Sequence, residues 1–322
     1  MEGFYYNRLS TTIEKEIYET LAEGFLHHKK SILIPKMDVQ DLNVLYQKVF
    51  YDLPQLLHIR LSKVVVRGQR MEMLPEYRLS REQRRIILGK IEEKVKPILE
   101  KTAEKATAEE KEKWIHDFLA NTVSYGDIND PAHHEMSAVF LRGKGVCDSI
   151  SKAFLYLCLR SGIPAGIAVG KNEEGILPGS NLHSWNMVCI QDKWYQVDMT
   201  YDICASTQYG VVRYDYFNLS DRELPRKTLF DVPKCERAFH YYFNNGLYAD
   251  TRTRLKEIFK HRKSESVTVQ LPAIPDCSQE DLMEYIKEAV IEEDCLNVPI
   301  TEESKIYIYP NFGRNIFTIG IK

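Results

Sequence analysis

The stretch from Gly143 to Asp202 constrains the fold of this chain more than any other part of it. It begins with Gly-Lys-Gly-Val-Cys147 and continues into residues 148–161, where apolar side chains recur at the spacing of one helical face. This apolar face consists of Ile150, Ala153, Phe154, Leu157 and Cys158. Gly162 and Pro164 then end the helix, because glycine suits the C′ position and proline cannot continue a helix. Cys147 is therefore expected at or just before the N-terminus of a helix.

This position favours a reactive thiol at Cys147. Free backbone N–H groups and the positive end of the helix dipole stabilise an anion there, and the thiolate is the nucleophilic form of cysteine. The peptide N–H of Cys147 is also a candidate donor to an oxyanion. Gly143 and Gly145 would leave room for a substrate backbone. Asp148 acts in the opposite direction, because its carboxylate disfavours a second negative charge beside it.

Two predicted strands follow the helix and form an antiparallel hairpin. Residues 182–190 and 194–199 are rich in apolar and aromatic side chains, and only a short polar segment separates them. His183 shares a face of the first strand with Trp185. A two-residue turn would place Asp198 on the same face, as a diagonal neighbour within side-chain reach of His183. Asp202 has the same parity and remains the alternative partner.

Cys147, His183 and Asp198 follow one another in the order of a thiol nucleophile, its base and the acid that orients the base. In such a triad the carboxylate fixes the tautomer of the imidazole and stabilises its charged form. The alternative interpretation is a chance arrangement of a buried cysteine, a core histidine and an aspartate in a turn.

These segments resemble the transglutaminase-like superfamily, a branch of the papain-like cysteine enzymes. The matching motifs are Gly-Lys-Gly-Val-Cys147, Ser-Gly-Ile-Pro164, Ala-Val-Gly170, His183-Ser-Trp185-Asn and Trp194-Tyr-Gln-Val-Asp198-Met-Thr-Tyr-Asp202. The resemblance extends over residues 110–245 or so, and it implies that Cys147 is the nucleophile, His183 the base and Asp198 the orienting acid. It also implies an α+β fold, in which the nucleophile helix packs on an antiparallel sheet.

Two positions depart from the usual pattern of that superfamily. Asp148 and Ser149 follow the cysteine, where small or aromatic residues are common, and Met199 follows the aspartate, where proline is common. Neither change removes an atom of the triad, but both bear on which substrate is bound. The flanking segments, among them Tyr5–Leu9 and Tyr214–Asp221, resemble bacterial members of Clostridia type.

The composition excludes several classes of partner. The chain has 322 residues, of which 44% are hydrophobic and 28% are charged, with a formal net charge of −3. Neither nucleic acid nor an anionic membrane is an expected partner, because no excess of basic residues attracts them. No signal core and no apolar run long enough to span a bilayer occur. The 7 cysteines are widely spaced, which favours a reducing compartment, so we expect a cytoplasmic protein.

Three regions are expected along the chain. Residues 1–104 form a mainly helical N-terminal region, 105–262 the transglutaminase-like catalytic core, and 263–322 a small α/β module. Capping boxes at Ser80 and Thr107 predict where two long helices begin. No internal repeat is evident in the sequence.

Several strands are also predicted outside the central stretch. Those of the N-terminal region lie at 31–35, 61–66 and 72–79. The core has a further predicted strand at 214–219, followed by loop and short helix over 221–250. The C-terminal module follows a βαββ order, with strand, helix, strand and strand at 266–271, 279–292, 304–310 and 315–321.

The sequence suggests no metal site and no cofactor. Cys204, Cys235 and His240 lack the paired Cys-x-x-Cys spacing of structural zinc sites. No loop has the ligand pattern of an EF-hand. His116 lies on an amphipathic helix and is expected to be structural.

The sequence thus predicts a cysteine-dependent acyl-transfer enzyme that acts on peptide or glutamine carboxamide bonds through a thioester. With water as the acceptor it would be a protease or amidase, and with an amine it would cross-link proteins. That choice depends on how the site excludes water and binds an amine, and the sequence leaves it open. The alternative is a catalytically inactive interaction module. The expected partner is a protein or peptide substrate, and the oligomeric state is open.

Overall fold

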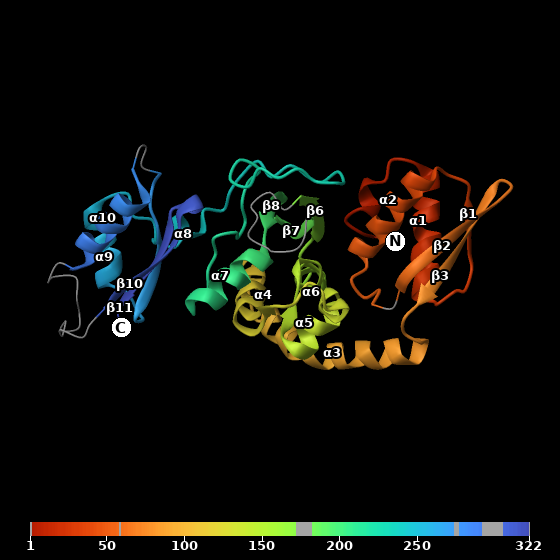
Figure 1. Cartoon of the computed structure of the whole chain (residues 1–322), viewed down its shortest axis with the longest axis horizontal. Helices are drawn as coiled ribbons and strands as arrows, with labels where there is room; N and C mark the ends of the chain where they lie inside the picture. The colour runs from red at the N-terminus through yellow and green to blue at the C-terminus, as the bar shows by residue number, and fades with distance from the viewer. Residues whose placement is uncertain (1, 58, 172–181, 274–276, 292–304, 322) are drawn as a thin grey trace.

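A computed structural model describes residues 2–57, 59–171, 182–273, 277–291 and 305–321 of the chain. The molecule is elongated, with one module at each end and the core between them (Figure 1). Helices and antiparallel sheets are combined in an α+β fold, as predicted. Among the described residues, no helix has both the length and the apolar character needed to cross a bilayer.

The N-terminal module packs two helices on a three-stranded antiparallel sheet. After a short 3-10 helix η1 (Tyr6–Arg8), its elements are α1 (Thr12–Leu26), β1 (Ile32–Pro35), α2 (Val39–Asp52), β2 (Ile59–Arg67) and β3 (Arg70–Tyr77), with the strand order β1-β3-β2. The three strands predicted in this region are confirmed. Apolar side chains of both helices and the sheet form one core, which includes Tyr18, Leu21, Phe25, Leu45, Val49 and Met73.

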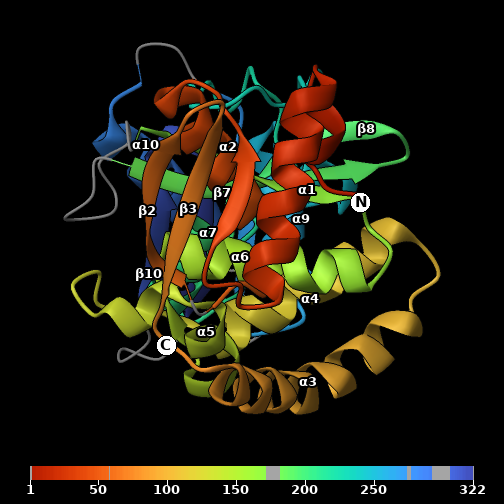
Figure 2. The same ribbon diagram turned by 90° about the vertical axis from the view of Figure 1, so that its right-hand side faces the viewer.

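A long helix connects this module to the core. Helix α3 (Arg81–Ala103) runs along one side of the molecule and leads to α4 (Ala108–Thr122) (Figures 1 and 2). Both begin at the predicted capping boxes, where Ser80 and Thr107 accept hydrogen bonds from the backbone N–H groups of Gln83 and Glu110. The predicted starts of these helices are thus confirmed.

The core places one buried helix against a three-stranded antiparallel sheet. Its elements are β4 (Ser124–Tyr125), η2 (Pro131–His134), α5 (Met136–Arg142), β5 (Lys144–Gly145), α6 (Cys147–Arg160), β6 (Ala165–Lys171), β7 (Leu182–Ile190), β8 (Lys193–Val197) and α7 (Met199–Tyr209). The strands lie in the order β6-β7-β8, and α6 packs on β6 and β7. Strands β4 and β5 form a separate parallel pair.

The predicted hairpin is confirmed, but its second strand ends earlier than expected. Ile190 pairs with Lys193 across a two-residue turn, Gln191-Asp192, whose φ angles are 51° and 61°. Positive φ at both residues is typical of a type I′ hairpin turn. Strand β8 ends at Val197 because Asp198 caps α7, a helix that the sequence pattern did not predict. The strand predicted at 214–219 is wrong, apart from one bridge between Leu219 and Gln196.

The C-terminal module confirms the predicted βαββ order. After α8 (Tyr241–Asn244), it contains α9 (Arg252–Lys260), β9 (Ser266–Gln270), α10 (Gln279–Ile291), β10 (Ile306–Asn311), a 3-10 turn η4 (Phe312–Arg314) and β11 (Ile316–Ile321). The strand order is β10-β11-β9, and all pairs are antiparallel. The segment 221–250 is loop with one short helix, as predicted.

The two end modules share one topology, although no repeat is evident in the sequence. Each runs helix, strand, helix and hairpin, and each places the last strand in the middle of its sheet: β1-β3-β2 in one, β9-β11-β10 in the other. In both modules the first helix begins at a threonine, Thr11 or Thr251, whose hydroxyl accepts a backbone hydrogen bond.

Candidate active site

Cys147 is the first residue of α6, as the sequence predicted. Its side chain is only 8% exposed. The residue before it is fixed from two directions, because the Val146 N–H donates to the carbonyl of His133 at 3.1 Å and to Ser149 Oγ at 3.0 Å. The structure shows why residue 145 is glycine, which the sequence did not reveal. A Cβ there would lie 2.5 Å from Ser149 Oγ and 2.7 Å from a methyl group of Val139.

A lysine on the same helix offsets the charge of Asp148 beside the thiol. Lys152 lies one turn further along α6, and its Nζ is 2.9 Å from Asp148 Oδ2. Burial lowers the pKa of Lys152, but the Asp148 carboxylate outweighs this effect and raises it above the ordinary value. The ammonium group therefore stays charged and balances the carboxylate that the sequence placed next to the nucleophile.

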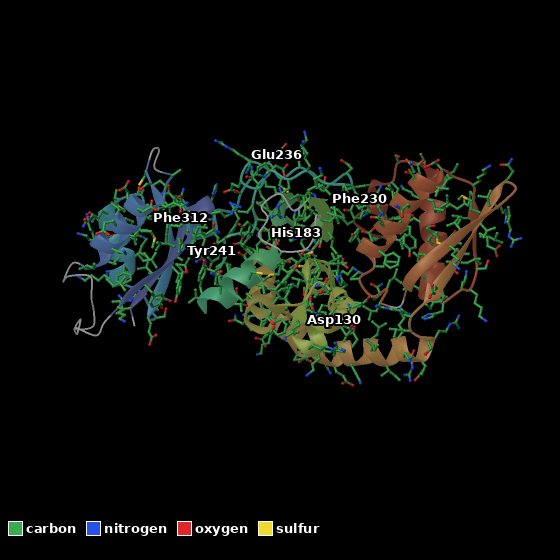
Figure 3. The ribbon with its side chains drawn as sticks, in the orientation of Figure 1. Asp130, His183, Phe230, Glu236, Tyr241 and Phe312 are labelled. Atoms are coloured by element: carbon green, nitrogen blue, oxygen red, sulfur yellow. The ribbon has the colours of Figure 1, made fainter. Side chains whose placement is uncertain are left out.

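His183 and Asp198 lie in direct contact in the interior of the core. His183 Nε2 is 2.6 Å from Asp198 Oδ2, and the two residues are 1% and 0% exposed. Strand β7 positions the imidazole (Figure 3), and the N-terminus of α7 positions the carboxylate, whose Oδ1 accepts a hydrogen bond from the Tyr201 N–H at 3.2 Å. Asp198 thus contacts the candidate base and caps a helix at the same time.

The ionisation of this pair follows from its contacts. Burial raises the pKa of Asp198, but the charges of His183 and Arg226 outweigh it and lower this pKa to about 2. Burial lowers the pKa of His183, but Asp198 and then Cys147, each by charge and by hydrogen bonding, raise it to about 9. An imidazolium is therefore the stable form at neutral pH, as a thiolate–imidazolium pair requires.

The second ring nitrogen of His183 is the one available to the thiol. Nε2 is engaged by Asp198, whereas Nδ1 is buried and forms no hydrogen bond of ordinary length and angle in the described part of the chain. Cys147 lies close enough for its thiolate to act on the ring. Hydrogen bonds of a catalytic group are often long before substrate binds and shorten in the complex.

Asp202, the alternative partner, belongs to a different histidine. Its Oδ2 lies 3.0 Å from His116 Nε2, and both side chains are completely buried. His116 also stacks on Tyr214, with ring centroids 4.8 Å apart. The expectation that His116 is structural fits this position, and Asp198 is the carboxylate that contacts His183.

Two aromatic rings lie nearly parallel to the His183 imidazole. The Tyr201 ring is nearly parallel to it, at 8°, with centroids 4.8 Å apart, and the Trp185 ring lies 6.0 Å away at 22°. Trp185 is 1% exposed and packs beside the base. The base therefore has little freedom to rotate.

Arg226 is a functional candidate that sequence reasoning missed. Its Nη1 lies 2.6 Å from Asp198 Oδ2, the oxygen that also contacts His183. Its guanidinium lies 4.8 Å from the Trp185 ring centroid and 5.0 Å from that of Tyr201, and the side chain is 5% exposed. It lies in a loop 28 residues beyond Asp198, and no local pattern marks it.

Tyr125 is a second residue that the sequence did not single out. The register of β4 on β5 pairs it with Gly145, two residues before Cys147, and its ring packs on the cluster that contains Cys147. Its hydroxyl is buried and has no hydrogen-bond partner among the described residues. Burial, and then the charges of Cys147, Cys204 and Asp198, hold the pKa of Tyr125 above its ordinary range, so the hydroxyl keeps its proton.

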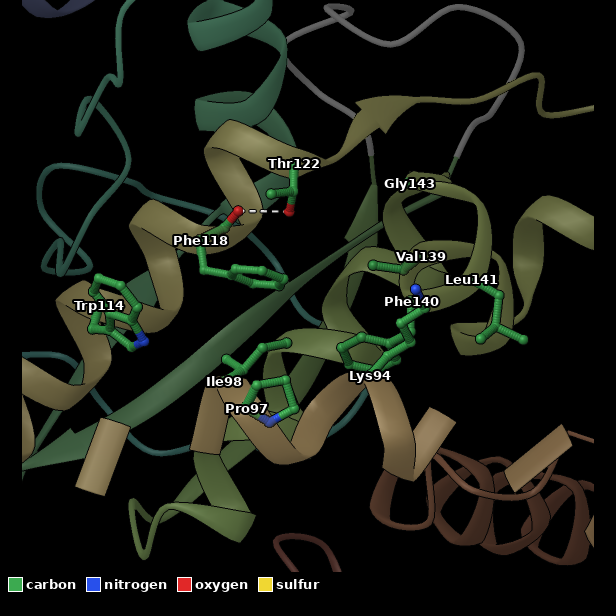
Figure 4. A pocket seen from close by; sticks show the side chains of 10 residues that line it. All are labelled: Lys94, Pro97, Ile98, Trp114, Phe118, Thr122, Val139, Phe140, Leu141 and Gly143. Carbon is green, nitrogen blue, oxygen red and sulfur yellow. Dashed lines mark hydrogen bonds between the residues drawn. The ribbon is translucent and has the colours of Figure 1, made fainter. Parts of the chain in front are cut away.

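A separate cavity lies between α3, α4 and α5, away from these residues. It has a volume of about 460 Å³ and is lined mainly by apolar side chains, among them Ile98, Trp114, Phe118 and Phe140 (Figure 4). Its lining contains none of Cys147, His183 and Asp198. Within the described ranges, no cluster of three or more histidine, cysteine or acidic side chains could hold a metal ion.

Part of the chain matches a known family. Residues 96–199 match the family model of the transglutaminase-like superfamily. No curated protein matches the chain.

Among solved structures, a transglutaminase is similar at 17% identity, with a TM-score of 0.32 over 53% of this chain and 50% of the other. A cysteine protease, so named provisionally, from Cytophaga hutchinsonii is similar at 15% identity, with a TM-score of 0.30 over 44% of this chain and 62% of the other. The periplasmic domain of TgpA from Pseudomonas aeruginosa is similar at 15% identity, with a TM-score of 0.28 over 41% of this chain and 55% of the other. The chain thus spans between half and two thirds of each of these structures.

The family match covers the end of α3, the helix that carries Cys147, and the hairpin that leads from His183 to Asp198. Over residues 96–199 the chain is thus similar to the transglutaminase-like superfamily.

Proposed function

We propose that the protein is a cysteine-dependent acyl-transfer enzyme that acts on a peptide or glutamine carboxamide bond. The observation that carries this proposal is the buried contact of 2.6 Å between His183 and Asp198 beside Cys147 at the N-terminus of α6. A buried imidazolium next to a cysteine at a helix N-terminus is an arrangement suited to a stable thiolate.

The reaction follows from these positions. The Cys147 thiolate attacks the substrate carbonyl carbon, and the C=O electron pair moves to oxygen as the tetrahedral oxyanion forms. When the C–N bond breaks, His183 gives its proton to the leaving amine, and a thioester remains on Cys147. His183 then takes a proton from water or an acceptor amine as it attacks the thioester. The acid or the new amide leaves, and the thiolate–imidazolium pair is restored.

Two donors are proposed for the oxyanion. One is the Cys147 backbone N–H, which lies in the first turn of α6 and has no carbonyl four residues earlier in that helix to bond. The other is the Tyr125 hydroxyl, which is protonated, buried and unpartnered within the described residues beside the thiol. A preorganised donor of this kind stabilises the charge that develops in the transition state.

Tyr125→Phe is expected to slow acylation of Cys147 about 10²-fold, because it removes one oxyanion donor. Alkylation by iodoacetamide should be nearly unchanged, because that displacement forms no oxyanion. The measurement compares, by mass spectrometry of the Cys147 peptide, the rates of modification by an activated acyl ester and by iodoacetamide. Equal losses in both rates would show that Tyr125 only supports the fold, and no loss in either would remove it from the mechanism.

The overall function is tested with a panel of glutamine-containing peptides, with and without a fluorescent primary amine. Amine incorporation that depends on Cys147 is expected for a transferase, and release of ammonia or new N-termini for a hydrolase. Cys147→Ala is the control and should abolish either product. An inactive interaction module would give neither product, and its Cys147 would be alkylated no faster than an ordinary cysteine.

The substrate class and location belong to the same proposal. The substrate is a protein or peptide, because a transglutaminase-like site acts on amides of protein chains. A cytoplasmic location is proposed from the wide spacing of the cysteines.

A further inference from the structure

Residues 219–229, called the strap here, cross the central sheet from one edge to the other. Leu219 exchanges backbone hydrogen bonds of 2.8 and 2.9 Å with Gln196 on β8. Ten residues later, the Leu229 N–H donates to the Val169 carbonyl on β6 at 2.7 Å. Since the strand order is β6-β7-β8, the strap spans β7, the strand that carries His183, and Arg226 lies within this crossing.

Gly170 allows the strap to approach the sheet. A Cβ at this position would lie 2.3 Å from the Lys227 carbonyl oxygen and 2.9 Å from the Trp185 ring. Neither neighbour can move easily, because one is backbone and the other is a fully buried indole. This contact explains the glycine of the Ala-Val-Gly170 motif, because only glycine lets the backbone just after Arg226 approach β6.

Four groups at the site can carry charge, and together they are balanced. The Cys147 thiolate and the Asp198 carboxylate are negative, and the His183 imidazolium and the Arg226 guanidinium are positive. Their exposures are 8%, 0%, 1% and, for the Arg226 side chain, 5%. A buried cluster tolerates charge only when it is paired. Without Arg226 the same cluster would carry one net negative charge, and a proton on the thiolate would be the simplest way to neutralise it.

We propose that Arg226 is a positioning residue, which holds the Asp198 carboxylate against His183 and supplies the positive charge that lets the thiolate–imidazolium pair persist. This inference rests on the proposed function, because it concerns the same nucleophile. It adds a fourth residue, delivered by the strap, to the three that the sequence identifies.

Among the described residues, the other titratable groups that face this cluster do not supply the positive charge of Arg226. Tyr125, from β4, and Tyr201, from α7, present neutral hydroxyphenyl rings. Burial, and then the charge of Asp198, raise the pKa of Cys204 on α7 to about 11, so its thiol is also neutral. On α6, Asp148 and Lys152 neutralise each other at 2.9 Å.

The test is the pH dependence of Cys147 alkylation by iodoacetamide, followed on the Cys147 peptide by mass spectrometry. Arg226→Met is expected to slow the reaction at pH 7 by about tenfold or more, since loss of one buried charge interaction is worth at least a factor of ten. Its rate should recover at higher pH, where hydroxide removes the proton from the thiol. Arg226→Lys should restore much of the rate, because it returns the charge without the fork geometry.

Two further variants separate this role from simple support of the fold. Arg222→Met removes the same charge from an exposed position in the strap and should leave the profile unchanged. Gly170→Ala keeps Arg226 but displaces the strap, and it should shift the profile in the same direction as Arg226→Met.

Each outcome decides a different point. A wild-type profile in Arg226→Met, with a lowered unfolding midpoint or without, would overturn the positioning role while leaving the proposed function intact. Failure of the proposed function would look different: wild-type Cys147 would then react slowly at pH 7, and His183→Ala would not change its rate.

Discussion

Replacing His183 with alanine is expected to lower acyl transfer by about 10⁴-fold or more, the loss typical when a triad base is removed. The reason is specific to this site. In the proposed mechanism, the imidazolium is both the counter-ion of the thiolate and, among the described residues, the acid that protonates the leaving amine. The measurement is the rate of product formation from a peptide substrate, together with the alkylation rate of Cys147 at pH 7, which should also fall.

His116→Gln is the matched control for this variant. Like His183, His116 is buried and contacts an aspartate. Its partner is Asp202, at 3.0 Å, which does not contact His183. Its loss is expected to affect stability and to leave the alkylation profile of Cys147 close to that of the wild type. If His116→Gln, and not His183→Ala, slowed alkylation, the assignment of the base would be wrong.

The pH dependence of the wild type follows from the same ring. The pKa of His183 is raised to about 9, so it carries a proton at neutral pH, and acyl transfer should decline only as the pH rises through about 9. The stability of the fold should change in the same direction as the activity, and decrease as the pH rises. A raised pKa contributes stability that is fully present below the unfolded value, about 6.5, and is lost as the pH rises through the folded value. The lowered pKa of Asp198, about 2, contributes stability that is fully present above the pKa of an unfolded aspartate. This stability is lost only in strong acid, as the pH falls through about 2.

Arg213→Met is expected to lower the free energy of unfolding by about 3–5 kcal/mol, the usual cost of breaking a buried ion pair from one side. Arg213 and Asp215 are 0% and 1% exposed, and their charged groups lie 2.7 Å apart. Arg213 also donates to Thr318 Oγ1 at 3.0 Å, and Asn311 donates to Asp215 at 2.8 Å. The pair thus fastens the C-terminal module to the core, and its loss leaves a buried carboxylate without its counter-charge.

Urea unfolding followed by circular dichroism measures this effect. Arg85→Met is the control, because Arg85 pairs with Glu82 on the exposed face of α3 and such pairs contribute little. Equal unfolding midpoints for Arg213→Met and the wild type would contradict the view that this pair holds the module in place.

The local parts of the fold and of the candidate site could be predicted from sequence because their signals are local. Ser80 and Thr107 mark helix starts through contacts three residues away, and the hairpin register follows from a two-residue turn. Alternation along β7 placed His183 on one face of the strand, and the register placed Asp198 and Asp202 on the same face. It did not by itself choose between Asp198 and Asp202, whose parity is the same, and only the structure shows which carboxylate meets His183.

The remaining features depend on contacts between distant segments. Arg226 contacts Asp198 because a loop without periodic pattern crosses the sheet, and Tyr125 packs on the cluster that contains Cys147 because β4 pairs with β5. The sequence pattern does not predict helix α7, because residues 194–199 resemble one apolar strand. In the structure the strand ends before Asp198, whose side chain caps the N-terminus of α7. The shared topology of the end modules is likewise visible only in the order of their strands.

The strap has a consequence for solubility as well as for chemistry. Sheets with unpaired outer strands invite intermolecular pairing, and proteins avoid aggregation by covering such edges. Here Leu219 occupies backbone groups on the outer side of β8, and Leu229 does the same on β6, so one loop blocks both borders of a small sheet at these points. A variant that loosens the strap would therefore lose protection against self-association together with the contact to Asp198.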